Sequence, residues 1–373
     1  DCELSRGLGD VYKRQRLASG NFPTQPNGDD ALLLEPFMLK PDAETASSQE
    51  VNFEKKWRAV VASFKKTLSA NWKLESSQLS NLNQSETSDS EPQQNTSKYW
   101  DLSDPVDLKE WYRPGLGLQG RSDKELPKTS GQFTVSLSGD TVINELLDSG
   151  LHSNLISEKY AARLTSPDFT ARPNQEVWLR LRGGGEATTR YAVQDYPRNG
   201  TVYPVSTLSD QWKWQRFDLS YWEGDNVHLE VTTARDAPLL VRNAEKSWFG
   251  ITDVIIQQKG SPAPSAPRLV AAQRIVESAL LNATTATKED AAKLYRVAIQ
   301  DAIVRWQTET ECDNSDTQLL AFCLRIGLLP NRISQLRRIE PLVSRYRELE
   351  AQVSIPTRVP TLEETSGRSQ PLY

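Results

Sequence analysis

The stretch VWLRLRGGG, running from Val177 to Gly185, decides the fold class of this chain. Its aliphatic residues alternate with tryptophan and arginine, and this period of two is typical of a β-strand with one face in a core and the other in water. The triple glycine that follows predicts a tight or bulged turn. Because no helical pattern comes after it, the glycines do not form a phosphate cradle at a helix start.

The same alternation recurs on both sides of this stretch, which indicates an antiparallel sheet with one wet face. It is found at Phe133–Leu137 and at Val227–Val231, while WFGITDVII (Trp248–Ile256) is apolar on both faces and predicts a central strand. Turn residues separate these runs, for example Glu223–Asp225. Short strands with regular turns predict an antiparallel jelly-roll-like β-sandwich over residues 99–259.

Helical periodicity dominates on either side of the predicted sandwich. Within an otherwise irregular segment, residues 16–74, apolar residues recur at helical spacing over about 53–72 and predict one amphipathic helix. A Pro- and Ser-rich linker, residues 260–267, leads into a small helical domain over 268–351. The fold class expected is therefore mainly β plus α.

Local signals place the helix ends in the C-terminal domain. Thr287 with Asp290 resembles a capping box, and Ser315 with Gln318 predicts the start of the next helix. Gly327 is the residue type that ends a helix.

The chain is expected to be a fragment with an N-terminal region and a linker that are disordered. DVYKRQ (Asp10–Gln15) matches the translation of a sequencing-adapter end, so we interpret residues 1–15 as an artefact and exclude them from the fold. Residues 75–98 are rich in Ser, Gln, Asn and Glu and predict the disordered linker. Residues 352–373 are interpreted as the truncated start of a further domain.

Composition excludes several functions. A net charge of −5 argues against a nucleic-acid partner, because phosphate binding needs a concentrated basic surface. No apolar run is long enough for a transmembrane segment. No motif for a catalytic residue is present, so we expect a non-catalytic chain.

Metal sites are not expected either. Cys312 and Cys323 stand outside CxxC and CxxCH patterns, and His152 and His228 have no cysteine or acidic partner at ligand spacing in the sequence. Asp253, near the end of a strand, is a candidate calcium ligand without a second ligand to join it. The two cysteines either form a disulfide, if the chain before Ser315 folds back, or remain buried thiols.

Several stretches together resemble large planctomycete proteins that join a cytochrome-c-like domain to two planctomycete-specific domains of unknown function. The resemblance covers Trp100–Tyr373 and rests on WDLSDPVDLKEWY (Trp100–Tyr112), Ser149–Phe169, VWLRLRGGG, WQRFDLSYWEGDNVHLEV (Trp214–Val231), WFGITDVII and Ile355–Tyr373. It implies an exported bacterial protein, periplasmic or extracellular, with haem c in an upstream domain and partners in the flanking domains. No cofactor is implied for the residues present here. The insert itself resembles galactose-binding-like jelly rolls.

Two functions remain open from the sequence. In the first, the chain is a carbohydrate-binding module in which Trp178, Arg180 and Arg182 share the outer face of one strand. A neighbouring strand offers Arg190 and Tyr191, of which only one can join them. A ring that stacks on a sugar, beside arginine forks that suit carboxylate or sulfate, predicts an acidic or sulfated polysaccharide. In the second, the chain is a structural spacer between a cytochrome-c-like domain and the C-terminal domain, and this face is solvated or covered by the helix at 53–72.

Overall fold

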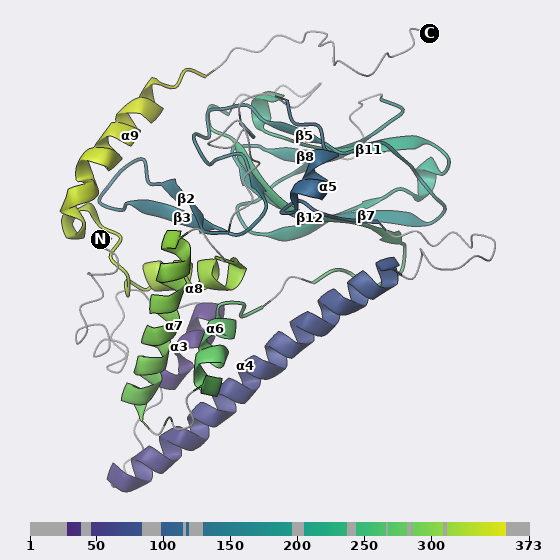
Figure 1. Cartoon of the computed structure of the whole chain (residues 1–373). Helices are drawn as coiled ribbons and strands as arrows, with labels where there is room; N and C mark the ends of the chain where they lie inside the picture. Colours follow the sequence, from purple (N-terminus) through teal and green to yellow (C-terminus); the bar gives the residue numbers. More distant parts are fainter. Residues whose placement is uncertain are drawn as a thin grey trace.

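The computed structural model describes residues 28–38, 46–83, 98–114, 117–118, 130–195, 205–236, 244–265, 268–281, 285, 287–308 and 312–355. Figure 1 shows a β-sandwich and a helical body that meet at a two-stranded ribbon. The expected combination of an antiparallel jelly-roll-like sandwich with helices is confirmed. None of the helices in these ranges is both long and apolar enough to cross a lipid bilayer.

One sheet of the sandwich, called sheet A, carries the strand that decided the fold class. Its strand order is β1 (Lys98–Asp101), β12 (Trp248–Gln258), β7 (Gln175–Gly184) and β10 (Lys213–Asp218), with β4 (Leu151–His152) also on β12. All these pairings are antiparallel. Because β12 lies between β1 and β7, the prediction of a central strand is confirmed.

The other sheet, called sheet B, is also entirely antiparallel. Its strand order is β5 (Arg163–Thr165), β11 (Asn226–Thr232), β8 (Thr188–Val193) and β9 (Val205–Thr207), with β6 (Phe169–Thr170) also on β11. The chain leaves sheet A at the triple glycine and enters sheet B at β8. The turn needs glycine because Gly185 has a φ of +60° and an added Cβ would lie 1.8 Å from the carbonyl oxygen of Lys246.

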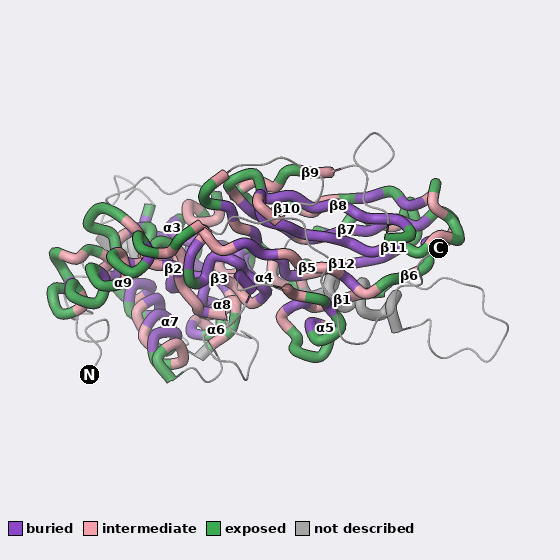
Figure 2. Tube along the Cα trace, turned by 90° about the horizontal axis from the view of Figure 1, so that it is seen from above, coloured by how far each residue is buried: buried purple, intermediate pink, exposed green. Residues whose placement is uncertain are grey.

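The core of the sandwich lies between the two sheets. The alternating aliphatic residues predicted to face inward are all buried there: Val177, Leu179, Leu181, Val227, Leu229 and Val231. Long buried stretches run along β7, β8 and β11 (Figure 2). At one end the rings of Trp100 and Trp111 pack edge to face with centroids 5.5 Å apart. Sheet A thus has one side fixed in the core, and its other side faces outward.

A ribbon of β2 (Gln132–Val135) and β3 (Ile143–Leu147) joins the sandwich to the helical body. Leu146 belongs to the helical core, and the Nε1–H of Trp306 donates to the carbonyl oxygen of Gly131 at 2.7 Å. The strand predicted at 133–137 therefore exists, but it is shorter and lies outside the sandwich. Alternation predicts a strand without saying which core its apolar face meets.

The helical body contains α3 (Asp29–Met38), α4 (Ala46–Asn83), α6 (Ala272–Leu281), α7 (Lys288–Thr308) and α8 (Asn314–Arg325). Phe53, Trp57, Val60 and Phe64 of α4 are buried in the same core as α6, α7 and α8. The apolar stripe of α4 is therefore covered by the helical body. The alternative from the sequence, in which this helix covers the face that carries Trp178, is excluded.

Shorter elements complete the described chain. They are α5 (Pro105–Lys109), α9 (Glu340–Gln352) and the 3₁₀ turns η1 (Ser220–Trp222), η2 (Ala234–Asp236), η3 (Ile333–Gln335) and η4 (Arg337–Ile339). Arg347 of α9 donates to four carbonyl oxygens in the turn of the β2–β3 ribbon, at 2.8–3.3 Å. Helix α9 thus holds the turn of the ribbon.

Three local expectations need correction. The segment predicted to be irregular contains α3, whose Phe37 ring packs on Tyr295 with centroids 5.1 Å apart. Helix α4 continues to Asn83, so residues 75–83 of the expected disordered linker are helical, since no Gly or Pro interrupts the sequence there. The rest of that linker before Lys98, like residues 1–15, lies outside the described residues. Helix α8 begins at Asn314 and is capped by the Asp313 carboxylate, which accepts from the Asp316 N–H at 3.0 Å.

Two other predictions of helix ends are confirmed. Thr287 Oγ1 accepts from the N–H of Asp290 at 3.1 Å at the start of α7. Gly327, with a φ of +70°, follows the end of α8. Cys312 and Cys323 are not joined in a disulfide; Cys323 is buried in the helical core, and Cys312 is half-buried.

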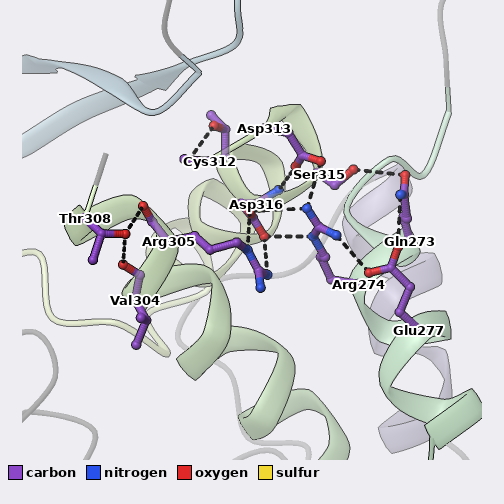
Figure 3. A network of polar contacts seen from close by, with 11 residues as sticks. Gln273, Arg274, Glu277, Val304, Arg305, Thr308, Cys312, Asp313, Ser315 and Asp316 are labelled. Carbon is purple, nitrogen blue, oxygen red and sulfur yellow. Dashed lines mark hydrogen bonds and ion pairs between the residues drawn. The ribbon is translucent and has the colours of Figure 1, made fainter. Parts of the chain in front are cut away.

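A buried carboxylate ties three helices together (Figure 3). Asp316 of α8 is fully buried and accepts from Arg305 of α7 twice, both at 2.7 Å. It also accepts from Arg274 of α6 at 2.8 Å. Burial alone would raise the pKa of Asp316, but the hydrogen bonds and charges of the two arginines outweigh burial and lower it. The carboxylate is therefore charged and compensated in the fold.

Replacing Asp316 by Ala is expected to destabilise the protein by about 3 kcal/mol, because two arginines lose their shared buried acceptor. Urea unfolding monitored by circular dichroism measures this loss. The matched control is Glu348→Ala, which removes the exposed partner of Arg345 and should cost less than about 1 kcal/mol. Equal losses in the two variants would contradict the role given to Asp316.

Candidate functional site

The outer side of β7 carries the residues singled out in the sequence. Val177, Leu179 and Leu181 are buried in the core, so Trp178 and Arg180 point away from it. The rings and guanidinium groups of this side are half-buried or, for Arg182, buried. The structure therefore brings Trp178, Arg180 and Arg182 together on one face, as the alternation predicts.

Strand β10 adds two residues that the sequence analysis did not single out. Trp214 lies directly opposite Arg180, and Arg216 lies directly opposite Trp178. Residues paired across an antiparallel sheet point to the same side, so they continue the face. The alternation of Trp214 and Arg216 with the buried Phe217 predicts that both point outward. It assigns them to the same face as Trp178 only once β10 is known to pair with β7. We call Trp178, Arg180, Trp214 and Arg216 the aromatic face.

A buried carboxylate fixes the outermost row of the aromatic face. Glu176, 2% exposed, accepts from Trp178 Nε1 at 2.8 Å, from Gln257 Nε2 at 2.9 Å and from Arg216 Nε at 2.7 Å. Burial would raise the pKa of Glu176, but hydrogen bonds from Gln257, Trp178 and Arg216 outweigh it and lower that pKa. One charged group thus orients both the ring and the guanidinium group.

The next row pairs charge in the same way. Arg180 Nη1 lies 3.7 Å from Asp253 Oδ2, and the Tyr99 hydroxyl donates to Asp253 Oδ1 at 2.7 Å. Burial, with the nearby Asp253 carboxylate, raises the pKa of Tyr99. Because hydrogen-bond donors and an arginine surround Asp253, the arrangement does not fit the calcium site considered from the sequence.

Arg182 serves the structure at the inner end of the face. It is buried, forms an ion pair with Glu145 of the ribbon, and lies 5.0 Å from the ring centroid of Trp212 and 5.1 Å from that of Trp248. Beside it, His152 is buried, and burial with the nearby Arg182 charge lowers its pKa to about 3. These groups close the face toward the ribbon, and the Trp212 ring also lies 5.3 Å from the guanidinium group of Arg180.

Arg190 and Tyr191 do not join the face, because β8 belongs to sheet B. Tyr191 points into the core, where its hydroxyl accepts from Trp222 Nε1 at 3.1 Å. Arg190 is buried on the far side of the sandwich and pairs with Glu230 at 2.5 Å. The expectation that one of them extends the site was wrong. It assumed that consecutive strands β7 and β8 pair in one sheet, whereas they belong to different sheets.

His228 also differs from the sequence expectation. Its ring lies within 3.4–3.7 Å of three carboxylates, those of Asp168, Asp195 and Glu230. Two of these residues come from other strand ends, so the acidic partners could not be found by ligand spacing along the sequence. The cluster lies on sheet B, away from the aromatic face.

No family model and no curated protein matches the chain. Among solved structures, it resembles a family 61 carbohydrate-binding module in complex with β-1,4-galactotriose, at 17% identity and a TM-score of 0.19 over 27% of this chain and 64% of that one. It also resembles a family 29 carbohydrate-binding module from Piromyces equi, at 9% identity and a TM-score of 0.24 over 45% of this chain and 95% of that one.

A third similar structure is the glycoside hydrolase domain of Endo-D from Streptococcus pneumoniae R6, at 15% identity and a TM-score of 0.23. That match covers 40% of this chain and 22% of the other. The chain therefore spans less than two thirds of the length of the first and third of these structures. The functional argument therefore rests on the residues of the site and not on these likenesses.

Glu176→Gln tests whether a charged carboxylate orders the aromatic face. At neutral pH the variant should be less stable by about 1–3 kcal/mol, because the hydrogen bonds to a charged acceptor are weakened. The folded pKa of Glu176 is lowered, so its stabilisation is present above the unfolded pKa of about 4.3 and disappears as pH falls through the folded value.

Urea unfolding at several pH values between neutral and about pH 3 measures this effect. The stability gap between the wild type and Glu176→Gln should narrow on acidification, since all other carboxylates titrate in both proteins. A gap that stays constant or widens would contradict the lowered pKa.

Proposed function

We propose that the aromatic face binds polysaccharide and that the chain acts as a non-catalytic carbohydrate-binding module. The observation that carries the proposal is a repeated unit, a tryptophan ring beside an arginine–carboxylate pair, in two adjacent rows of one sheet. The first row holds Trp178 with Arg216 and Glu176, and the second holds Trp214 with Arg180 and Asp253.

The chemistry of a sugar ring fits this unit. The C–H face of a pyranose is apolar and packs on an aromatic plane, while the hydroxyls at its rim need donors and acceptors together. The arginine side chains supply donors beside the rings, and the carboxylates paired with them hold the guanidinium groups in place. Because Trp178 and Trp214 stand on neighbouring strands in adjacent rows, a chain lying obliquely across the strands meets both rings.

The charge balance favours a neutral polysaccharide. Arg216 is paired with Glu176 and Arg180 with Asp253, so each positive charge of the face is offset by a carboxylate. The acidic or sulfated ligand expected from the sequence relied on free arginines. We therefore propose hydroxyl recognition, and we place the module outside the cytoplasm as part of a larger protein, where it would meet such polymers.

Pre-organisation supports binding by this face. Trp178 Nε1 is held by Glu176, and Glu176 itself is held by Gln257 and Arg216. Little side-chain freedom is left to lose when a ligand stacks on the ring, so less of the contact energy is spent on ordering.

A second candidate, the structural spacer, is favoured by the firm junction between sandwich and helices. Asn314 at the start of α8 accepts from the N–H of Ser149 at 2.7 Å and from the hydroxyl of Ser130 at 2.8 Å. A second contact joins the sandwich to α9, where Lys159 Nζ donates to the carbonyl oxygen of Glu350 at 2.6 Å. Such a junction suits a part that fixes the geometry of neighbouring domains.

Affinity electrophoresis of the full chain in gels containing soluble xylan, mannan, galactan, glucan, polygalacturonate or a sulfated galactan separates the two candidates. We expect retardation by a neutral polymer, and Trp178→Ala should weaken binding by about 30-fold, the cost of losing a central aromatic anchor of about 2 kcal/mol.

Tyr221→Ala is the matched control, because Tyr221 is an exposed aromatic residue of η1 that lies outside the aromatic face. Its affinity should equal that of the wild type. Retardation only by the anionic polymers would restore the acidic-ligand expectation. No retardation by any polymer would favour the structural spacer. Binding that Trp178→Ala leaves unchanged would show that the aromatic face is not the binding site.

A further inference from the structure

The outer side of sheet B carries a cluster that the aromatic face does not use. His228 lies on β11, and Val227 beside it pairs with Phe169 of β6 and with Val193 of β8. Asp168 immediately precedes β6, and Asp195 follows the end of β8. Three strand ends that are distant in sequence therefore meet around one imidazole ring.

The ligand atoms are spaced as a metal ion requires. His228 Nδ1 lies 3.4 Å from Asp195 Oδ1 and 3.7 Å from Asp168 Oδ1, and all three atoms lie within 4.8 Å of one another. Zinc bonds to nitrogen and oxygen are about 2.0–2.2 Å long, and at tetrahedral angles the ligand atoms then stand about 3.4 Å apart. The two separations from His228 Nδ1 are close to this spacing, and the two exposed carboxylates can turn to complete the site.

The contact that His228 Nε2 makes with Glu230 orients the imidazole ring, so that Nδ1 faces the proposed ion position. His228 Nε2 faces Glu230 Oε1 at 3.6 Å, and Glu230 is held by buried Arg190 at 2.5 Å. Metal-binding histidines commonly direct their second nitrogen to a carboxylate, which fixes the ring and its tautomer. His228 is 9% exposed, and its Nδ1 faces the carboxylates of Asp195 and Asp168.

Charge favours a cation here. Asp168, Asp195 and Glu230 contribute three negative charges, of which the pairing with Arg190 offsets one. A divalent cation would meet the carboxylates of Asp168 and Asp195 at the position that His228 Nδ1 faces. The side chain of Asp195 is 58% exposed and that of Asp168 37%, so an ion has a path from solvent and would keep a position for water.

We propose that Asp168, Asp195 and His228 form a zinc site, with Glu230 as the carboxylate that orients His228. The mixed nitrogen and oxygen ligand set suits zinc rather than calcium, which prefers six to eight oxygen atoms. An ion at this point would link the ends of β6, β8 and β11. It would lie on the opposite sheet from the aromatic face and is independent of the polysaccharide proposal.

Isothermal titration of the full chain with ZnCl₂, after treatment with a chelator, tests the site. The wild type should bind one Zn²⁺ and gain thermal stability, because an ion that binds only the folded state stabilises it. Asp195→Asn should weaken binding at least about tenfold while its circular dichroism spectrum stays unchanged, since Asp195 is exposed. His228→Gln should abolish binding.

Asp210→Asn, at an exposed residue outside the cluster, is the matched control and should bind as the wild type does. The spectrum of the Co²⁺-loaded protein should lack thiolate charge-transfer bands, because no cysteine belongs to the cluster. Absence of Zn²⁺ binding, or binding that Asp195→Asn leaves unchanged, would overturn the proposal even where His228→Gln fails to fold.

Discussion

The burial of one side of β7 is the constraint on which the sandwich and its candidate site both depend. Val177, Leu179 and Leu181 are placed in the core by the hydrophobic effect, and a strand has no freedom to turn one residue without turning the next. Trp178 and Arg180 must therefore point outward. A register shift of one residue would bury the arginines, so the packing that stabilises the sheet also maintains the aromatic face.

Placing arginines on a half-buried sheet is costly unless each finds a counter-charge. The neighbouring strands supply one to each: Glu176 lies beside Arg216, Asp253 near Arg180, and Glu145 of the ribbon beside Arg182. The resulting face has polar groups in donor and acceptor pairs and little net charge. Such a surface gains little from long-range attraction of anions and most from close hydrogen bonding. Ligand selection thus follows from how the fold compensates its own charges.

Periodicity in the sequence predicted the strands β2, β7, β11 and β12, much of α4, a helical domain after the sandwich, and the shared face of Trp178, Arg180 and Arg182. It failed where the answer depended on pairing. Arg190 and Tyr191 follow β7 closely in sequence, yet the triple glycine turn carries them to the other sheet. Trp214 and Arg216 complete the face from a distant segment, and only the register β7–β10 reveals them. Strand alternation predicts which residues share a side, but adjacency within a sheet is a property of the tertiary fold.

The crossing at Gly183–Gly185 also separates the two sites that we propose. It sends β8 to sheet B, so Arg190 meets Glu230 and thereby fixes the carboxylate that faces His228. The aromatic face and the His228 cluster are then divided by the whole thickness of the apolar core, with no shared polar residue among those described. Two sites are coupled when an element that connects them can adopt two arrangements. A packed core of aliphatic side chains has a single arrangement, so it does not couple these two sites. An ion on sheet B is thus expected to act on the stability of the sandwich, while ligand recognition remains with the outer side of sheet A.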